Sequence, residues 1–175
     1  MIFVRLLPQL LDRAAEAGPE REALSDGMVR LSYGEAASRA NQLAHLLVEE
    51  GARSGDRVGI CLPRCLESAI AVYGILKAGA AFVPIDPSTP PAGIRQLLRD
   101  CDIRHLITHD SLARALGEVQ RETTPLRCVI GPKSAPGDLR CRPWSDLEAH
   151  DGGAAPDRRI LADDLAYIMY SSGST

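Results

Sequence analysis

The chain has 175 residues, a formal net charge of −3 and a hydrophobic fraction of 45%. This length predicts one domain, or one domain and part of another, with enough residues to bury a substantial core. The balance is slightly acidic and the two signs of charge are interspersed, which argues against a nucleic-acid-binding surface.

Two apolar stretches raise the question of targeting or membrane insertion. The first eleven residues are apolar, but Arg5 and Pro8 interrupt them and no small-residue cleavage site follows, so they do not predict a signal peptide. Residues 68–85 contain Lys77 and change from a helical to a strand-like pattern halfway. They predict a helix followed by a strand and no membrane span. We therefore expect a soluble, cytoplasmic protein.

The cysteines and histidines show no metal-binding spacing. There are five cysteines, an odd number, with no Cys-x-x-Cys pair, and the four histidines fall at no ligand spacing. The nearest pair, Cys61 and Cys65, is separated by Pro63 at the junction of a strand and a helix. The sequence therefore favours buried, reduced thiols over a zinc site, as is typical of a reducing compartment.

The first fifty residues predict a helix, a hairpin and a second helix. Apolar residues at 10, 11, 14 and 15 indicate an amphipathic helix that ends near Gly18. Short strands at 23–25 and 29–31 flank Asp26-Gly27, a typical hairpin turn. Ser32 followed three residues later by Glu35 is a capping box for the next helix. The apolar stripe of that helix comprises Ala36, Ala40, Leu43, Ala44 and Leu47, and Gly51 ends it.

Strands and helices then alternate. This order predicts an α/β fold with a mostly parallel sheet and helices on both of its faces. Residues 131–164 are rich in Pro, Gly, Asp and Arg and are interpreted as a surface excursion, with a helical pattern only at 144–147. The expected elements are strand 57–62, helix 65–77, strand 80–85, helix 94–99, strand 105–108, helix 112–119, strand 127–130 and a final strand 165–170.

The final strand leads into a run of small polar residues. Glycine lets a backbone approach an anion closely, successive N–H groups form a concave set of donors, and hydroxyls add donors without bulk. The run therefore indicates a phosphate-binding loop, although a frayed tail or a linker has the same composition. Its residues are Ser171, Ser172, Gly173, Ser174 and Thr175.

Four segments together resemble the adenylate-forming superfamily. They read LSYGE at 31–35, GDRVGI at 55–60, LKAGAAFVPIDP at 76–87, and the strand and loop at 165–175. This superfamily comprises acyl-CoA synthetases, stand-alone ligases that activate amino acids or aryl acids, and the adenylation domains of nonribosomal peptide synthetases. The proline-containing end of the third segment is most similar to the branches that activate amino acids or load carrier proteins.

The resemblance implies an AMP-forming ligase. A carboxylic or amino acid attacks the α-phosphate of ATP, which gives an acyl-adenylate and releases pyrophosphate. A thiol of CoA or of a carrier protein's phosphopantetheine arm then takes the acyl group and AMP leaves. It implies that residues 171–175 wrap the β- and γ-phosphates, with Mg²⁺ accompanying the nucleotide. No residue that matches a catalytic residue of the family is present. Lys77 is interpreted as complementing a helix C-terminus and Asp86 as forming a turn with Pro87.

The chain departs from the family where the loop should continue with Gly, a variable residue, Pro, Lys and Gly. The family's substrate pocket and C-terminal subdomain also lie beyond residue 175. We therefore expect residues 1–175 to be the N-terminal part of a ligase domain, and the isolated chain to be inactive. The alternative hypothesis is a short non-catalytic protein that binds a partner, such as the other half of a split enzyme. The final strand motivates it, because both of its faces are apolar.

Overall fold

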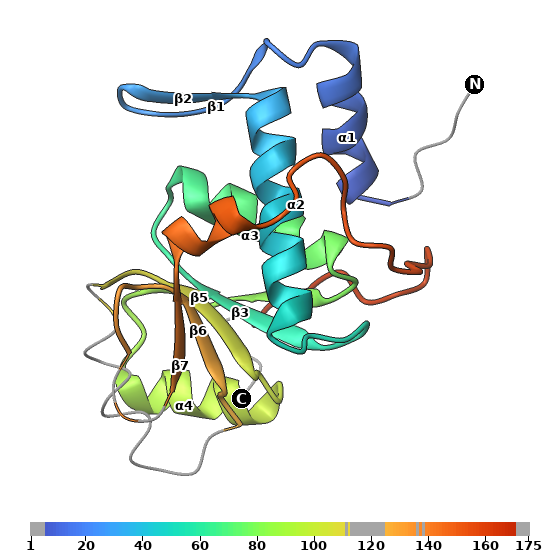
Figure 1. Cartoon of the computed structure of the whole chain (residues 1–175). Coiled ribbons are helices and arrows are strands. Elements are labelled where there is room, and N and C mark those ends of the chain that lie inside the picture. Colours follow the sequence, from blue (N-terminus) through green and yellow to red (C-terminus); the bar gives the residue numbers. More distant parts are fainter. Residues whose placement is uncertain (1–5, 111, 113–124, 136, 138, 171–175) are drawn as a thin grey trace.

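Five parallel strands form one sheet at the centre of the molecule (Figure 1). The computed structural model describes residues 6–110, 112, 125–135, 137 and 139–170. In this part of the chain the strand order is β4-β3-β5-β6-β7, and every neighbouring pair is parallel. The strands are β3 (Arg57–Cys61), β4 (Ala81–Pro84), β5 (His105–Thr108), β6 (Cys128–Gly131) and β7 (Arg140–Pro143).

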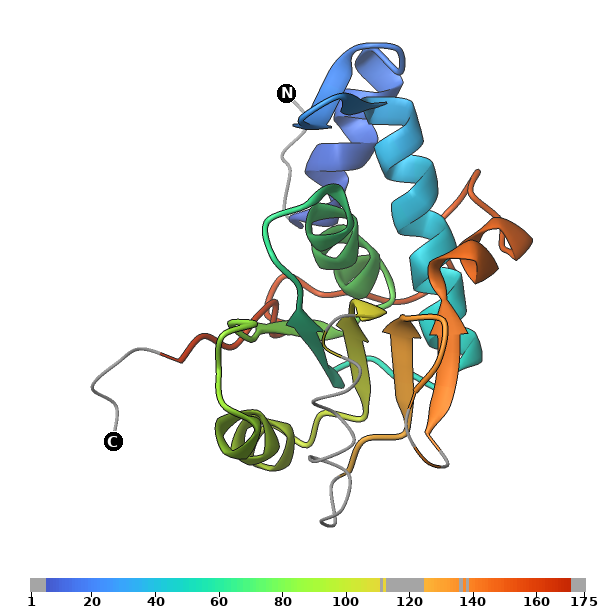
Figure 2. The same cartoon turned by 90° about the vertical axis from the view of Figure 1, so that its left-hand side faces the viewer.

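Helices cover both faces of this sheet, as predicted. Helix α3 (Leu66–Lys77) connects β3 to β4, and α4 (Pro91–Asp100) carries the chain back across β3 to β5. The two crossovers run in opposite directions and place their helices on opposite faces (Figure 2). The chain therefore changes direction across the sheet at the β3–β5 pair, which makes this an open, doubly wound fold.

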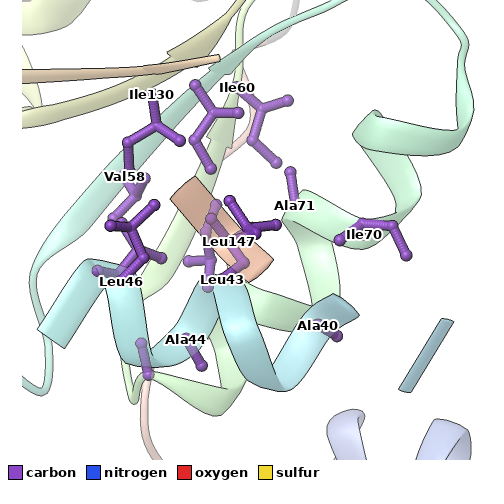
Figure 3. Close-up of a cluster of buried hydrophobic side chains, with 14 of the residues drawn as sticks. Ala40, Leu43, Ala44, Leu46, Val58, Ile60, Ile70, Ala71, Ile130 and Leu147 are labelled. Atoms are coloured by element: carbon purple, nitrogen blue, oxygen red, sulfur yellow. The ribbon is translucent and has the colours of Figure 1, made fainter. Parts of the chain in front are cut away.

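The larger part of the core lies between the sheet, α3 and α2 (Tyr33–Glu49), with α1 (Pro8–Ala17) packed against both helices. Alternate strand residues such as Val58, Ile60 and Ile130 point into it, as expected for strands buried on both faces (Figure 3). Leu43 of α2 lies at its centre and is fully buried. The predicted stripe of α2 is thus confirmed as the face that meets α3 and the sheet.

The opposite face of the sheet carries a smaller core under α4. Ile94 and Leu98 of that helix pack with Val83, Leu106 and Val129, which alternate with the strand residues of the first core. Because β3, β4, β5 and β6 each contribute to both clusters, these four strands are buried on both sides. This burial explains why the sequences of these four strands are largely apolar.

The N-terminal predictions are confirmed in detail. The hairpin consists of β1 (Glu22–Asp26) and β2 (Val29–Ser32), which pair antiparallel around Gly27 at a φ of 60°. Glu35 donates its backbone N–H to Ser32 Oγ at 3.2 Å, and the Glu35 carboxylate accepts from the Ser32 N–H at 2.8 Å. This reciprocal pair starts α2, and Gly51 at a φ of 89° follows its end.

Two predictions were wrong in part. Residues 131–164 were interpreted as a surface excursion, but they contain β7, the last strand of the sheet. The helical pattern predicted at 144–147 is confirmed, because the short 3-10 helix η1 (Trp144–Ala149) follows β7. Residues 165–170 were predicted as a strand, but they form only an isolated parallel bridge, between Phe82 and Tyr167. The predicted helix 112–119 lies outside the described residues except for residue 112. In the part of the chain that the structure describes, no helix has the length and apolar character needed to cross a bilayer.

Candidate functional site

The predicted phosphate-binding residues Ser171, Ser172, Gly173, Ser174 and Thr175 lie outside the described residues. The structure does describe the segment that leads to them, which runs along the free edge of β4. Phe82 donates its N–H to the carbonyl of Ala166 at 3.0 Å, and Ile168 donates to the carbonyl of Phe82 at 3.1 Å. The Phe82 and Tyr167 rings stack with their centroids 5.5 Å apart. These contacts hold residues 166–168 against the sheet, directly before the segment that the sequence predicts to bind phosphate.

Two further side chains hold this segment on the α4 side of the sheet. Ile168 packs against the smaller core. The Tyr170 hydroxyl lies 3.4 Å from Cys101 Sγ, where α4 ends. The hydrogen bond with Cys101 and, next, burial raise the pKa of Tyr170 to about 12, so this hydroxyl stays protonated at neutral pH. Tyr170 is therefore a neutral anchor at pH 7.

Lys77 and Asp86, the ionisable residues of the third motif, have structural partners. Lys77 lies in the last turn of α3, as predicted, but its buried ammonium donates to Asn41 of α2 at 2.6 Å and pairs with Asp12 of α1. Asp86 accepts from the N–H of Ser88 at 2.8 Å and from its hydroxyl at 2.7 Å, which lowers the pKa of Asp86. The predicted turn at Asp86-Pro87 is confirmed, and neither residue is free for acid–base work.

The carboxyl ends of β3 and β5 meet at one edge of the sheet, where the chain changes direction. Open α/β sheets bind ligands in the crevice outside such a point. Here Cys65 at the start of α3 and His109 directly after β5 come together, with Sγ and Nε2 3.8 Å apart. Glu67, in the first turn of α3, completes the group. Sequence spacing misses this cluster because Cys65 and His109 are 44 positions apart in the chain.

A comparison with protein-family models identifies the family of the chain. Residues 11–175 match the family model described as AMP-binding enzyme, which is most of the chain and includes all four motif segments. The chain belongs to the AMP-binding enzyme family. The resemblance inferred from the motifs is thereby confirmed, and so is the α/β fold with a mostly parallel sheet.

Among curated proteins, this AMP-binding chain is similar to synthases of peptides. Tyrocidine synthase 2 of Brevibacillus parabrevis is 37% identical over 174 residues, which cover 97% of this chain and 4% of the relative. A linear gramicidin synthase protein of the same organism is 38% identical over 167 residues, which cover 95% of this chain and 3% of the relative. The chain thus spans only a small part of the length of these relatives.

Solved structures agree with the fold. The structure of VinN in complex with 3-methylaspartate has a TM-score of 0.78 and 26% identity, and the match covers 97% of this chain and 44% of VinN. The nonribosomal peptide synthetase FmoA3, in its AMPPNP-bound form, has a TM-score of 0.78 and 28% identity over 98% of this chain and 17% of FmoA3. Both likenesses cover nearly the whole chain, including the sheet and its helices.

Proposed function

We propose that this chain supplies the N-terminal part of an AMP-forming ligase. The ligase activates a carboxylic or amino acid with ATP as an acyl-adenylate and passes the acyl group to a thiol. The observation that carries the proposal is the attachment of residues 166–168 to the edge of β4, directly before a hydroxyl- and glycine-rich run, in a chain of the AMP-binding family. A rigid base of this kind suits a loop that has to hold an anion in one place.

In this proposal Ser171, Ser172, Gly173, Ser174 and Thr175 bind the β- and γ-phosphates of ATP. The donor set fits the ligand, because backbone N–H groups and hydroxyls donate to anionic phosphate oxygens in charge-assisted hydrogen bonds. Hydroxyl oxygens also suit Mg²⁺, a hard cation that neutralises phosphate charge when it is bound. The pattern Gly-x-x-x-x-Gly-Lys is absent, so the binding differs from that of a Walker loop.

The likeness to VinN, solved with 3-methylaspartate, supports an amino acid as the substrate. The likeness to a nonribosomal peptide synthetase supports a carrier protein's phosphopantetheine thiol as the acceptor, and CoA is the other acceptor that the family uses. The alternative of a short non-catalytic binding protein is not favoured, because the whole match falls within an enzyme family. In our proposal the 175-residue chain is inactive by itself, because no residue in it matches a catalytic residue of the family.

The test is amino-acid-dependent ATP–pyrophosphate exchange by the longer protein that contains this chain. We expect exchange with at least one acid of a broad panel, followed by transfer to a phosphopantetheinylated carrier protein. The variant Thr175→Val should raise the KM for ATP about tenfold or more without changing the KM for the acid, since one charge-assisted hydrogen bond is lost. Ser145→Ala, an exposed serine of η1, is the matched control. No exchange with any acid would refute the proposal.

A further inference from the structure

We propose that Cys65, Glu67 and His109 form a binding site for one zinc-like divalent cation at the carboxyl edge of the sheet. One ligand atom from each residue (Sγ, a carboxylate oxygen and a ring nitrogen) lies within 4.8 Å of the other two. All three side chains are half-buried, so a cation from solvent can reach them while the protein shields them in part. The site does not depend on the phosphate-binding loop or on the proposed ligase reaction.

The spacing of the ligand atoms fits tetrahedral coordination. Zinc binds thiolate sulfur at about 2.3 Å and imidazole nitrogen at about 2.0–2.1 Å, so at a tetrahedral angle the two atoms lie about 3.6 Å apart. Cys65 Sγ and His109 Nε2 are 3.8 Å apart, and a shift of a few tenths of an ångström brings them to that spacing. Three protein ligands leave a fourth position for water, as in open zinc sites.

The fold holds the two backbones in place. The Cys65 N–H donates to Ser68 Oγ at 3.3 Å, and Ser68 Oγ donates back to the Cys65 carbonyl at 2.7 Å, which fixes the start of α3. On the other side, Thr108 Oγ1 donates to the Cys61 carbonyl at 2.8 Å and joins β5 to β3 directly before His109. The ligands therefore come from two anchored points and not from a long loop.

The chemistry of the three side chains selects the kind of cation. A thiolate and an imidazole favour zinc and similar transition metals, whereas Mg²⁺ and Ca²⁺ prefer oxygen ligands. Burial and, to a lesser extent, the neighbouring Glu67 raise the pKa of Cys65, so without a metal the thiol is protonated. When the cation binds, the Sγ–metal bond replaces the S–H bond and the proton leaves to solvent.

Charge is balanced in the metal-bound state. The Cys65 thiolate and the Glu67 carboxylate supply two negative charges to a dication, and His109 binds as the neutral imidazole. The N-terminus of α3 disfavours a cation modestly, because the helix dipole is positive there. Two anionic ligands from the same helix turn offset this effect. Without a metal, the Cys65 thiol contacts the His109 ring at 3.8 Å and also interacts with the Glu67 side chain.

The experiment is a Co²⁺ titration of the reduced, chelator-dialysed chain, followed by competition with Zn²⁺. We expect a thiolate-to-cobalt charge-transfer band that saturates at one equivalent and disappears when Zn²⁺ is added. Cys65→Ser should abolish the band, and His109→Ala and Glu67→Gln should each weaken binding at least tenfold. Cys141→Ser removes another half-buried thiol and should leave the band unchanged. Far-ultraviolet circular dichroism of every variant serves as the control for folding.

Several outcomes would overturn the site. A chain that gives no charge-transfer band with Co²⁺ has a simple thiol–imidazole contact at this position. A band that persists in folded Cys65→Ser, or that is lost in Cys141→Ser, places the cation elsewhere. Unchanged affinity in both His109→Ala and Glu67→Gln likewise contradicts the proposed ligand set.

Discussion

Replacing Gly74 by alanine is expected to destabilise the chain, although alanine is the better helix former. A Cβ at this position of α3 would lie 2.7, 2.8 and 2.9 Å from Cδ2, Cγ and Cβ of Leu43 in α2. Carbon atoms in ordinary contact are about 3.5–4.0 Å apart. A change of Leu43 rotamer can move Cγ and Cδ2, but Cβ is fixed to the backbone, so α2 and α3 must separate.

The magnitude follows from two opposing effects. Overpacking of a core costs about 1–3 kcal/mol, and the upper value applies here because Leu43 is fully buried at the centre of the larger core (Figure 3). The higher helix propensity of alanine offsets about 1 kcal/mol of this cost. The free energy of unfolding should therefore fall by about 2 kcal/mol, and Tm by about 4–8 °C for a chain of this size.

The assay is urea unfolding of the chain, followed by circular dichroism. Gly93→Ala is the matched control, because it is also a helical glycine and its Cβ meets only the Thr89 methyl, at 2.8 Å. We expect Gly93→Ala to change stability by no more than about 1 kcal/mol, in the stabilising direction. In the double variant Gly74→Ala, Leu43→Ala, the free energy of unfolding should fall by less than the sum of the falls in the two single variants, because the smaller side chain at 43 leaves room for the new methyl group. If Gly74→Ala is as stable as Gly93→Ala, the packing argument is refuted.

Three further predictions concern residues that join elements. Lys77→Met should lower the free energy of unfolding by about 1–3 kcal/mol in urea titrations, because the buried Asn41 loses the donor to its side-chain oxygen; an unchanged midpoint would contradict this. Ser32→Ala should cost about 1 kcal/mol in the same assay through loss of the cap of α2, and Ser32→Asp should restore most of it. Hydrogen bonds from Arg142, and then from His150, hold the pKa of Glu49 below its ordinary value of 4.5. This contribution is present above pH 4.5 and is lost as the pH falls through the lower folded value, so Glu49→Gln should show a smaller drop of Tm on acidification than the unchanged chain.

Much of the fold could be predicted from local sequence, because each signal acts within a few residues. The reciprocal hydrogen bonds of Ser32 and Glu35 span three positions, and the glycine at 79 ends α3 at a φ of 80° that other residues rarely adopt. The alternation of apolar strands and amphipathic helices also follows from periodicity alone. These features do not depend on how distant parts of the chain meet.

The errors have long-range causes. The strand β7 (Arg140–Pro143) contains two arginines and a proline and does not resemble a buried strand. It joins the sheet because Arg140 Nε pairs at 2.7 Å with Glu50, a buried carboxylate at the end of α2, and Arg142 binds the same residue. The cluster at Cys65 was missed for the same reason, since only the pairing of β3 with β5 brings His109 to it.

Residues 165–170 do not form the predicted strand because the neighbouring strand, β4, contains a proline. Parallel pairing along β4 would next need a donor at residue 84, and Pro84 has no N–H. The pairing therefore stops at Phe82. The apolar side chains that predicted a buried strand remain largely exposed, with Leu165 at 52% and Met169 at 69%.

Pro84, on the edge strand β4, keeps the segment 165–170 from becoming a sixth strand of the sheet, although the two lie against each other. Releasing the segment that precedes the proposed phosphate loop would break the two backbone hydrogen bonds of Phe82 and its ring contact with Tyr167, together with the packing of Ile168 and the contact of Tyr170 with Cys101. It would not disturb any pairing among the five strands. The segment is thus attached to the outside of the sheet without being one of its strands, and the five strands pair independently of it.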